Sequence, residues 1–264
     1  MVYIWNRVTH GTLVYTKFKK KGERPMPRIF VTGDTHGMYD RKKLNTKEFK
    51  EQKTLTKDDF VIIVGDVAMR WDDTKSDGKL SPRDRNMIEW YENKNFTTLF
   101  IDGNHENHKA LNAYPTEIWN GGKIHRLSDS VIHLMRGQVY KINDKKFFTM
   151  GGADSIDKMY RIKDESWWEE EMPSKYEYEE AINNLDKNNM TVDYVLTHCC
   201  GTSYLNDLFT AHFDQDELTQ FLNHLEFDFG LKFKHWYFGH HHQDKQIDEK
   251  HTCLYQNIIE IKEN

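Results

Sequence analysis

Five short polar motifs, each placed directly after an apolar run, constrain the fold of this sequence more than any other feature. The motifs are Asp34-Thr35-His36, Gly65-Asp66, Gly103-Asn104-His105-Glu106, Thr197-His198 and Gly239-His240-His241-His242. The runs before them have the length and composition of buried β-strands. Ligands of α/β folds gather beyond the carboxyl ends of the strands, so we expect all five motifs to meet at one edge of a sheet.

The first half of the chain alternates predicted strands with predicted helices. Compact apolar runs predict three buried strands, at residues 28–33, 60–65 and 97–102. We expect a surface helix over residues 42–53, a polar loop over 72–81 and a second helix beginning at Pro82. That second helix should turn three apolar side chains inward, those of Met87, Ile88 and Trp90. The alternation is typical of an α/β domain with parallel strand pairs.

The second half repeats this alternation less regularly. Strands are predicted at residues 138–142, 146–150, 193–197 and 235–239. Helices are predicted at residues 174–185 and 216–225, after an irregular stretch over 154–173. Residues 252–261 read as a closing β segment, with a hairpin as one possible arrangement.

The side chains of the five motifs suit a pair of metal ions. Two carboxylates, one amide oxygen and four imidazoles can act as ligands, and one further histidine is left over. The residues are Asp34, His36, Asp66, Asn104, His105, His198, His240 and His242. Oxygen and nitrogen donors without thiolate favour Mn²⁺, with Fe or Zn²⁺ as alternatives. A site with two divalent ions most often hydrolyses phosphate esters.

The spacing within the motifs agrees with this interpretation. Asp34 and His36 are two residues apart and can reach the same ion from one turn, and Asp66 is placed to bridge two ions. His240 and His242 share one side of an extended segment, so that His241 points away from them.

Composition limits the kind of protein this is. The chain has 264 residues, of which 30% are charged and 13% aromatic, so it is globular and not disordered. The motifs extend from residue 34 to residue 242, and we therefore expect one domain over residues 26–264. With 37 basic and 42 acidic side chains the net charge is −5, which gives no sign of nonspecific nucleic-acid binding.

The number of cysteines and the lengths of the apolar runs indicate the cellular compartment to expect. No apolar run approaches the roughly 20 residues of a membrane span, so no membrane association is expected. Three cysteines, at positions 199, 200 and 253, imply no disulfide framework, which fits a cytoplasmic protein. Cys199 and Cys200 directly follow His198 and invite a zinc–thiolate interpretation. No second cysteine pair completes such a site, which favours a packing role near the metals.

Residues 1–25 differ from the rest of the chain. Six basic side chains stand against Glu23 alone, and no apolar stretch of signal-peptide length is present. One hypothesis is that Met26 is the natural start and that residues 1–25 are not native. The alternative is a genuine N-terminal arm with two short edge strands.

The motifs together resemble the calcineurin-like metallophosphoesterase superfamily, in the manner of its bacterial and phage-type members, over about residues 28–262. The resemblance implies a four-layer αββα sandwich, in which helices flank two mixed β-sheets. It implies one ion on Asp34, His36 and His242, a second on Asn104, His198 and His240, and Asp66 between them. His105 would not bind metal but would stabilise or protonate the leaving group. A metal-bridging hydroxide would attack phosphorus in line.

The chain departs from one branch of that superfamily. Protein serine/threonine phosphatases typically carry Gly-Asp-x-Val-Asp-Arg-Gly at the second motif, whereas residues 65–71 read Gly-Asp-Val-Ala-Met-Arg-Trp. The second aspartate and the following glycine are missing, which weakens a phosphoprotein reading. The Gly-His-x-His ending is more similar to the phosphodiesterase and nucleotide-phosphatase branches.

Three residues outside the ligand set are candidates for substrate binding. Arg70 lies four residues past Asp66 and can clamp a phosphate oxygen, or it can form an ordinary ion pair. Arg161 lies in the irregular stretch and is a weaker candidate of the same kind. Trp167, beside Trp168, can stack on a base or can simply pack inward.

The sequence therefore predicts a dinuclear-metal-dependent phosphoesterase. Its expected substrate is a phosphate mono- or diester, either a small molecule or a nucleotide. A serine/threonine phosphoprotein phosphatase is the first alternative. An inactive binding scaffold with the same fold is the second, and the complete ligand set argues against it, because a scaffold has no reason to keep so many buried polar groups.

Overall fold

The computed structural model describes residues 26–72, 79–209 and 215–262. Both hypotheses about residues 1–25 fall outside these ranges. Within them, no helix combines the length and the apolarity that crossing a bilayer requires.

The first of two sheets contains the first three predicted strands. In spatial order it consists of β13 (Ile258–Glu260), β1 (Ile29–Thr32), β2 (Phe60–Val64), β3 (Thr97–Ile101), β6 (Val131–Leu134), β5 (Gly122–Ser128) and β4 (Thr116–Trp119). Its central pairs, β1–β2, β2–β3 and β3–β6, are parallel. Antiparallel pairing of β13 with β1 and of β5 with both of its neighbours makes this sheet mixed.

The second sheet is also mixed. Its order is β11 (Lys245–Gln246), β12 (His251–Cys253), β10 (His235–Phe238), β9 (Tyr194–Thr197), β8 (Lys145–Met150) and β7 (Gln138–Ile142). The pairs from β12 to β8 are parallel, whereas β11 and β7 pair antiparallel with their neighbours. The closing β segment is therefore not a hairpin, because β12 and β13 belong to different sheets.

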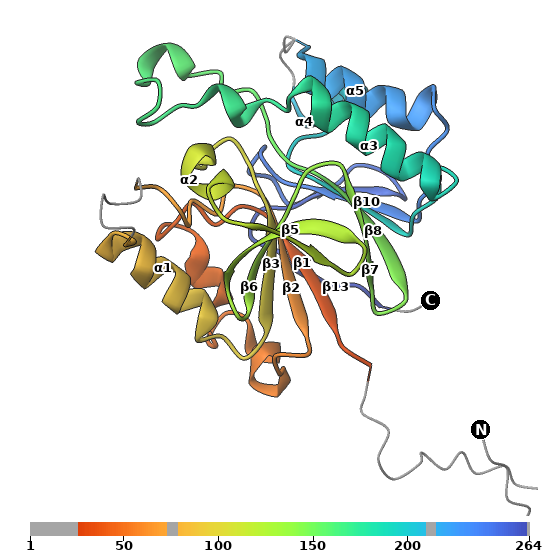
Figure 1. Cartoon of the computed structure of the whole chain (residues 1–264). Coiled ribbons are helices and arrows are strands. Elements are labelled where there is room, and N and C mark those ends of the chain that lie inside the picture. The colour runs from red at the N-terminus through yellow and green to blue at the C-terminus, as the bar shows by residue number, and fades with distance from the viewer. Residues whose placement is uncertain (1–25, 73–78, 210–214, 263–264) are drawn as a thin grey trace, which may run out of the picture.

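Helices cover the outer faces of the two sheets. Figure 1 shows α1 (Pro82–Glu92) on one side and α3 (Lys175–Lys187), α4 (Thr202–Leu208) and α5 (Glu217–Phe227) on the other. The short helix α2 (His108–Asn112) lies near the green segment that leads from β8 to α3. The predicted four-layer sandwich of helices and two mixed sheets is confirmed.

Alternation along the strands builds three apolar layers. On β2, Ile62 and Val64 pack between the two sheets, whereas Val61 and Ile63 pack against α1. On the other sheet, the side chains of β8 and β9 alternate between the space shared by the sheets and the layer beneath α3 and α5. Successive side chains of a strand point to opposite faces, so a strand with helices on one side and a second sheet on the other is apolar throughout.

The prediction of one helix over residues 42–53 is wrong. Two 3₁₀ helices take its place, η1 (Arg41–Leu44) and η2 (Lys50–Thr54), and both Leu44 and Phe49 are buried. Residues five apart lie on different faces of an α-helix, so burying both apolar side chains requires a break between them. The Gln52 amide donates to the Leu44 carbonyl at 2.8 Å and to the Phe49 carbonyl at 3.0 Å, which satisfies two groups that the break leaves free.

Helix α1 begins where Pro82 predicts, with Ser81 as its N-cap. Met87 and Ile88 are buried as expected, and Trp90 also packs against their core cluster but is only partly buried. Its ring lies 4.5 Å from the Arg41 guanidinium carbon and 3.4 Å from Lys94 Nζ. These cations lie against the ring of a side chain that the core covers only in part.

Several elements had no sequence signal. Strands β4 to β6 were not predicted, and β4 is a short edge strand with mostly exposed side chains and no clear alternation. Helices α2 and α4 have five and seven residues, too few for a periodic pattern. Residues 154–173 are irregular as predicted, apart from the single turns η3 (Lys158–Tyr160) and η4 (Glu169–Glu171).

Candidate metal centre

The predicted ligands gather at one edge of the molecule. Asp34, Asp66 and Asn104 follow the carboxyl ends of β1, β2 and β3 in the first sheet. His198 and His240 follow β9 and β10 in the second sheet. The carboxyl ends of both sets of parallel strands therefore meet at the same place, and each sheet supplies part of the site.

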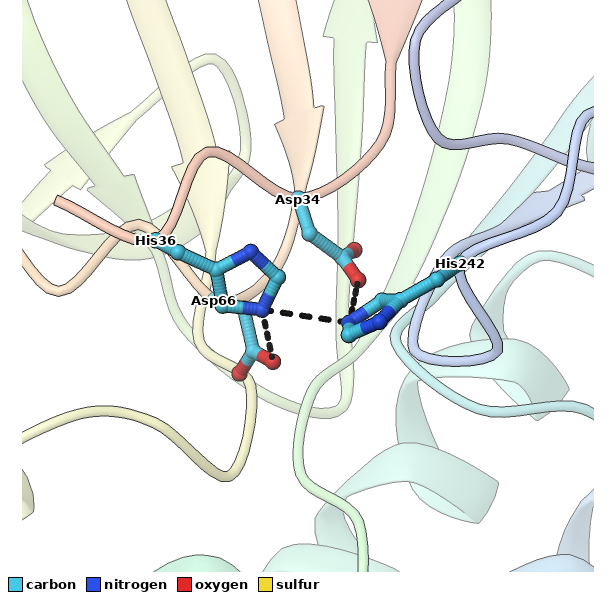
Figure 2. Close-up of side chains that lie close together, drawn as sticks. All are labelled: Asp34, His36, Asp66 and His242. Carbon is cyan, nitrogen blue, oxygen red and sulfur yellow. Dashed lines mark hydrogen bonds and ion pairs between the residues drawn. The ribbon is translucent and has the colours of Figure 1, made fainter. Parts of the chain in front are cut away.

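Four side chains form a first group, shown in Figure 2: Asp34, His36, Asp66 and His242. The Nε2 atom of His36 lies 3.3 Å from Asp66 Oδ2 and 3.2 Å from His242 Nε2. The Nε2 atom of His242 lies 3.4 Å from Asp34 Oδ2. The donor atoms thus surround a common point.

A second group contains Asp66, His198 and His240. The Nε2 atom of His198 lies 3.2 Å from Asp66 Oδ1 and 3.1 Å from the amide oxygen of Asn104. The rings of His198 and His240 are 5.1 Å apart. Asn104 thereby joins this group, as its sequence position suggests.

Asp66 belongs to both groups. Its Oδ2 faces His36, and its Oδ1 faces His198 and also accepts a hydrogen bond of 2.8 Å from the His105 amide. Oδ2 is buried and makes no hydrogen bond within the described chain. A buried carboxylate oxygen without a donor is costly, and a cation is the partner that would satisfy it.

The donor spacing fits metal ions. Ligand atoms about 2.1 Å from one ion and at right angles to each other lie about 3.0 Å apart. The contacts within the two groups run from 3.1 to 3.4 Å. The residues present therefore fit two ions that share Asp66.

Neighbouring groups orient two of the imidazoles. The Nδ1 atom of His36 lies 2.8 Å from an Asp40 carboxylate oxygen, and Nδ1 of His198 lies 2.8 Å from the Val64 carbonyl. With an ion at the centre, each acceptor would take the proton on Nδ1 and Nε2 would present its lone pair to the ion. Asp40 had no role in the sequence interpretation, although it lies four residues after His36.

The electrostatics favour positive charge between the groups. Burial lowers the pKa of His36 and of His198, but the carboxylates of Asp66 and Asp34 outweigh it and raise these values to about 9 and about 10. Burial raises the pKa of Asp34 to about 6, although His198 opposes it. For Asp66, burial alone would raise the pKa, but His198 and His36 hold it well below the usual range. The carboxylates thus stabilise positive charge on the neighbouring imidazoles, as they would stabilise a bound cation.

Glycines in the motifs allow the close approach of the ligands. A β-carbon at Gly103 would lie 2.2 Å from Asp66 Oδ1, and one at Gly239 would lie 2.2 Å from Asp34 Oδ1. A β-carbon at Gly65 would lie 2.0 Å from His198 Nδ1. Larger residues at these positions would displace a ligand from the place where the fold puts it.

Backbone strain also occurs in the same turns. His36, Asp66, His240 and His242 all have positive φ, between 40° and 64°. This conformation costs of the order of 1–3 kcal/mol for a residue other than glycine, and such residues cluster at functional sites. Hydrogen bonds between turns hold the strained positions, including the His36 amide to the Asp66 carbonyl at 2.7 Å.

His105 lies at the rim of the centre and outside both groups. Its ring is 5.6 Å from that of His36. Burial lowers its pKa, Asp66 opposes this effect, and Arg161 reinforces it. One guanidinium nitrogen of Arg161 lies 3.4 Å from His105 Nε2. Arg161 is thus brought to the centre from a distant part of the chain.

The other two substrate-binding candidates lie differently. Arg70 is buried, and its guanidinium bonds the buried carboxylate of Asp84, which is the ion-pair alternative and not a phosphate clamp. Trp167 is half-buried and Trp168 is buried, the latter with its ring 5.6 Å from Trp71. Trp168 therefore packs inward, and Trp167 keeps part of its surface exposed.

Two buried groups near the ligands had no role in the sequence interpretation. Glu106 accepts a hydrogen bond of 2.7 Å from the Val67 amide, and burial and the nearby Asp66 raise its pKa to about 8. Lys43 donates to the carbonyls of Gly33 at 2.9 Å and Asp34 at 2.8 Å. Both side chains brace the turns that carry ligands. Glu106 adjoins a motif, but the position of Lys43 carries no such signal.

The cysteines lie outside both ligand groups. Cys199, Cys200 and Cys253 are buried and unpaired by disulfides. The Sγ atom of Cys200 lies 3.5 Å from His241 Nε2, and His241 packs against Phe209. His241 therefore turns away from the centre as expected, but the expected extended segment is wrong, because His240 and His242 have φ of 64° and 51° and join different ligand groups. The contacts favour packing as the role of the cysteines.

The double sheet thus carries two groups of side chains that could hold metal ions and that share one carboxylate. The sequence profile of the calcineurin-like phosphoesterases matches residues 27–244. The chain belongs to this family, whose members are phosphoesterases that typically depend on two metal ions.

Other comparisons add little. One similar solved structure is the phosphopantetheinyl hydrolase PptH from Mycobacterium tuberculosis, at 13% identity over 87% of this chain and 90% of that one, with a TM-score of 0.38. A search of the curated proteins found no match.

Proposed function

We propose that this protein hydrolyses a phosphate mono- or diester of a small molecule or nucleotide at a dinuclear metal centre. The observation that carries the proposal is the position of Asp66, whose two oxygens face two separate ligand groups. A carboxylate in that position holds two cations at the short separation that phosphoryl-transfer sites use.

The ligand roles follow the two groups. Asp34, His36 and His242 would hold one ion with Asp66, and Asn104, His198 and His240 would hold the other with Asp66. When bound, the ions supply a nucleophile at neutral pH and neutralise the phosphoryl oxygens. Nitrogen and oxygen donors without thiolate favour Mn²⁺ over ions that prefer soft sulfur ligands, with Fe and Zn²⁺ as alternatives.

His105 and Arg161 would act on the substrate directly. His105 borders the first group and is within reach of an ester oxygen at the centre, where its proton can stabilise the leaving group. Arg161 beside it presents a guanidinium whose planar fork suits a phosphate. A phosphate between them would also offset the repulsion that the charge of Arg161 exerts on protonated His105.

The surroundings of the centre favour an ester group that is partly apolar. Of the eleven large hydrophobic side chains that are exposed in the described residues, six lie on the two segments that lead away from His36 or surround Arg161. They are Met38, Tyr39, Ile156, Met159, Tyr160 and Ile162. Trp167, in the second of these segments, adds a partly exposed aromatic surface. Such side chains can contact a base or another aromatic group of the substrate.

An activity screen tests the proposal. Protein stripped with a chelator is reloaded separately with Mn²⁺, Zn²⁺ and Fe²⁺ and assayed with p-nitrophenyl phosphate and bis(p-nitrophenyl) phosphate. We expect hydrolysis with Mn²⁺ and none after chelation. Full turnover after exhaustive chelation would contradict the metal role. A protein that binds two ions and hydrolyses neither ester nor a panel of nucleotides would be a scaffold.

A further inference from the structure

The segment between β8 and α3, residues 151–174, reaches the metal centre at two points. At the first, the Asn104 side-chain nitrogen donates to the Ser155 hydroxyl at 3.0 Å, and Ser155 is only 2% exposed. This bond fixes which end of the Asn104 amide faces the centre. Its oxygen is turned toward His198 Nε2, at 3.1 Å.

Near the second point, where Arg161 meets His105, the segment carries a buried carboxylate. Glu171 is 1% exposed, and within the described chain neither of its carboxylate oxygens makes a hydrogen bond of ordinary geometry. A guanidinium nitrogen of Arg161 lies 3.9 Å from Glu171 Oε1. Burial raises the pKa of Glu171 to about 7, and Ser155 and Arg161 oppose this effect. Ser155 and Arg161 are therefore its polar neighbours.

Arg161 closes the chain of contacts. Its guanidinium lies 2.8 Å from Asp157 on the exposed side and 3.4 Å from His105 Nε2 on the side of the centre. Asn104 and His105 are adjacent in sequence. A second connection between them runs through the segment 151–174, by way of Ser155, Glu171 and Arg161.

The backbone around Glu171 prevents its side chain from turning to solvent. The Arg136 guanidinium donates to the Glu170 carbonyl at 2.7 Å and to the Glu171 carbonyl at 3.3 Å. Trp168 packs against Trp71 just before this turn. A carboxylate held in this way without full hydrogen bonding reduces stability, so a role at the adjacent centre explains it better than packing does.

We propose that Ser155 and Glu171 are positioning residues of the metal centre, Ser155 for the metal ligand Asn104 and Glu171 for the phosphate-binding Arg161. This inference rests on the proposed function. Ser155 holds the amide oxygen of Asn104 toward the ion. Glu171 attracts the guanidinium and restricts its motion, so that less entropy is lost when the substrate binds.

The Ser155 part is tested by Ser155→Ala. We expect one Mn²⁺ ion, the one assigned to Asn104, His198 and His240, to bind about 10–100-fold less tightly in a calorimetric titration, and the other ion to be unaffected. The matched control is Ser166→Ala, which removes a hydroxyl that bonds only within the same segment, to the Ile162 backbone. Thermal unfolding shows whether each variant is folded. Unchanged Mn²⁺ affinity in folded Ser155→Ala would overturn this half.

The Glu171 part is tested by Glu171→Gln, which keeps the size of the side chain and removes its charge, at a pH well above the raised pKa of about 7. We expect KM, and the dissociation constant of inorganic phosphate, to rise roughly tenfold while kcat and Mn²⁺ affinity stay unchanged. The control is Glu169→Gln, whose exposed carboxylate pairs with Lys163 at 2.7 Å. Unchanged phosphate affinity, or loss of an ion, would overturn this half.

These measurements separate the two proposals. If wild-type protein binds two ions and hydrolyses no ester, the proposed function fails. The Mn²⁺ and phosphate titrations of the variants still decide whether Ser155 and Glu171 act as positioning residues.

Discussion

The Nε2 atom of His36 lies 3.2 Å from the Nε2 atom of His242, although the two residues are 206 positions apart in the sequence. His36 follows a strand of one sheet, and His242 follows a strand of the other. Asp40 occupies the other ring nitrogen of His36, so the facing nitrogens are the ones available to an ion. The two sheets therefore meet at the centre. The following experiments test what the residues there do.

Asp66→Asn should remove both ions together. Asparagine has nearly the same shape but lacks the charge, and its amide nitrogen would face either His36 or His198. Elemental analysis after dialysis measures metal content, with the exposed Asp186→Asn as the control. Retention of one ion at full occupancy would show that Asp66 does not bridge.

Gly103→Ala should displace Asp66 and lower metal content. The new methyl group would lie 2.2 Å from Asp66 Oδ1. Gly230→Ala is a useful control, because its methyl group meets no atom within 4 Å while a φ of 68° still strains the backbone. The control should lose stability and keep its ions. Equal metal content in both variants would argue against the role of Gly103.

His105→Ala should keep both ions and lower kcat by about 10²-fold or more, if His105 acts as a general acid. The side chain lies outside both ligand groups, so its removal leaves the donors in place. Metal analysis and steady-state kinetics check this, with the exposed His224→Ala as the control. Loss of metal in His105→Ala would show that the role assignment is wrong.

Arg70→Met should mainly affect stability, whereas Arg161→Met should mainly affect KM. Removing Arg70 leaves the buried Asp84 carboxylate with only part of its partners, Arg83 and the backbone amides of Trp71 and Asp72, and should lower the free energy of unfolding. Removing Arg161 should raise KM and cost less stability, because Glu171 lies 3.9 Å away and, with a pKa already raised to about 7, can take up a proton instead of staying charged. Urea unfolding and kinetics on both variants distinguish the cases. A stable Arg70→Met protein with a raised KM would restore the phosphate-clamp hypothesis.

His125 should make the protein less stable in acid. Burial, and then the neighbouring His133, lower the pKa of His125 to about 4 in the folded state, from 6.5. Between these values the unfolded chain binds the extra proton, so the free energy of unfolding falls as pH decreases, by at most about 1.4 kcal/mol per pH unit. His125→Gln should reduce this slope in urea unfolding measured from pH 7 to pH 4. An unchanged slope would contradict the assignment.

The centre itself could be predicted from the sequence, for a physical reason. Strands β1, β2, β3, β9 and β10 are buried on both faces and therefore appear as continuous apolar runs. A ligand directly after such a run has its position fixed by the sheet. Asp66 is the clearest case, because the apolar run of β2 ends just before it.

The surroundings of the centre could not be predicted in the same way. Ser155 and Glu171 lie in a segment without periodicity, where only the folded backbone brings them to Asn104 and Arg161. Arg70 follows a motif closely enough to suggest a phosphate contact. Its partner Asp84 lies 14 residues later, on a helix whose position the sequence pattern does not specify.

The pairing of β13 with β1 has a consequence for how the protein matures. Arg28 at the start of β1 bonds Glu260 on β13 at 2.6 Å, across 232 positions of sequence. While a ribosome is still making the chain, β1 lacks this neighbour, and His242 has not yet joined His36. The two ligand groups therefore cannot be complete before the residues after β10 are translated, and β1 keeps an unprotected edge until β13 follows.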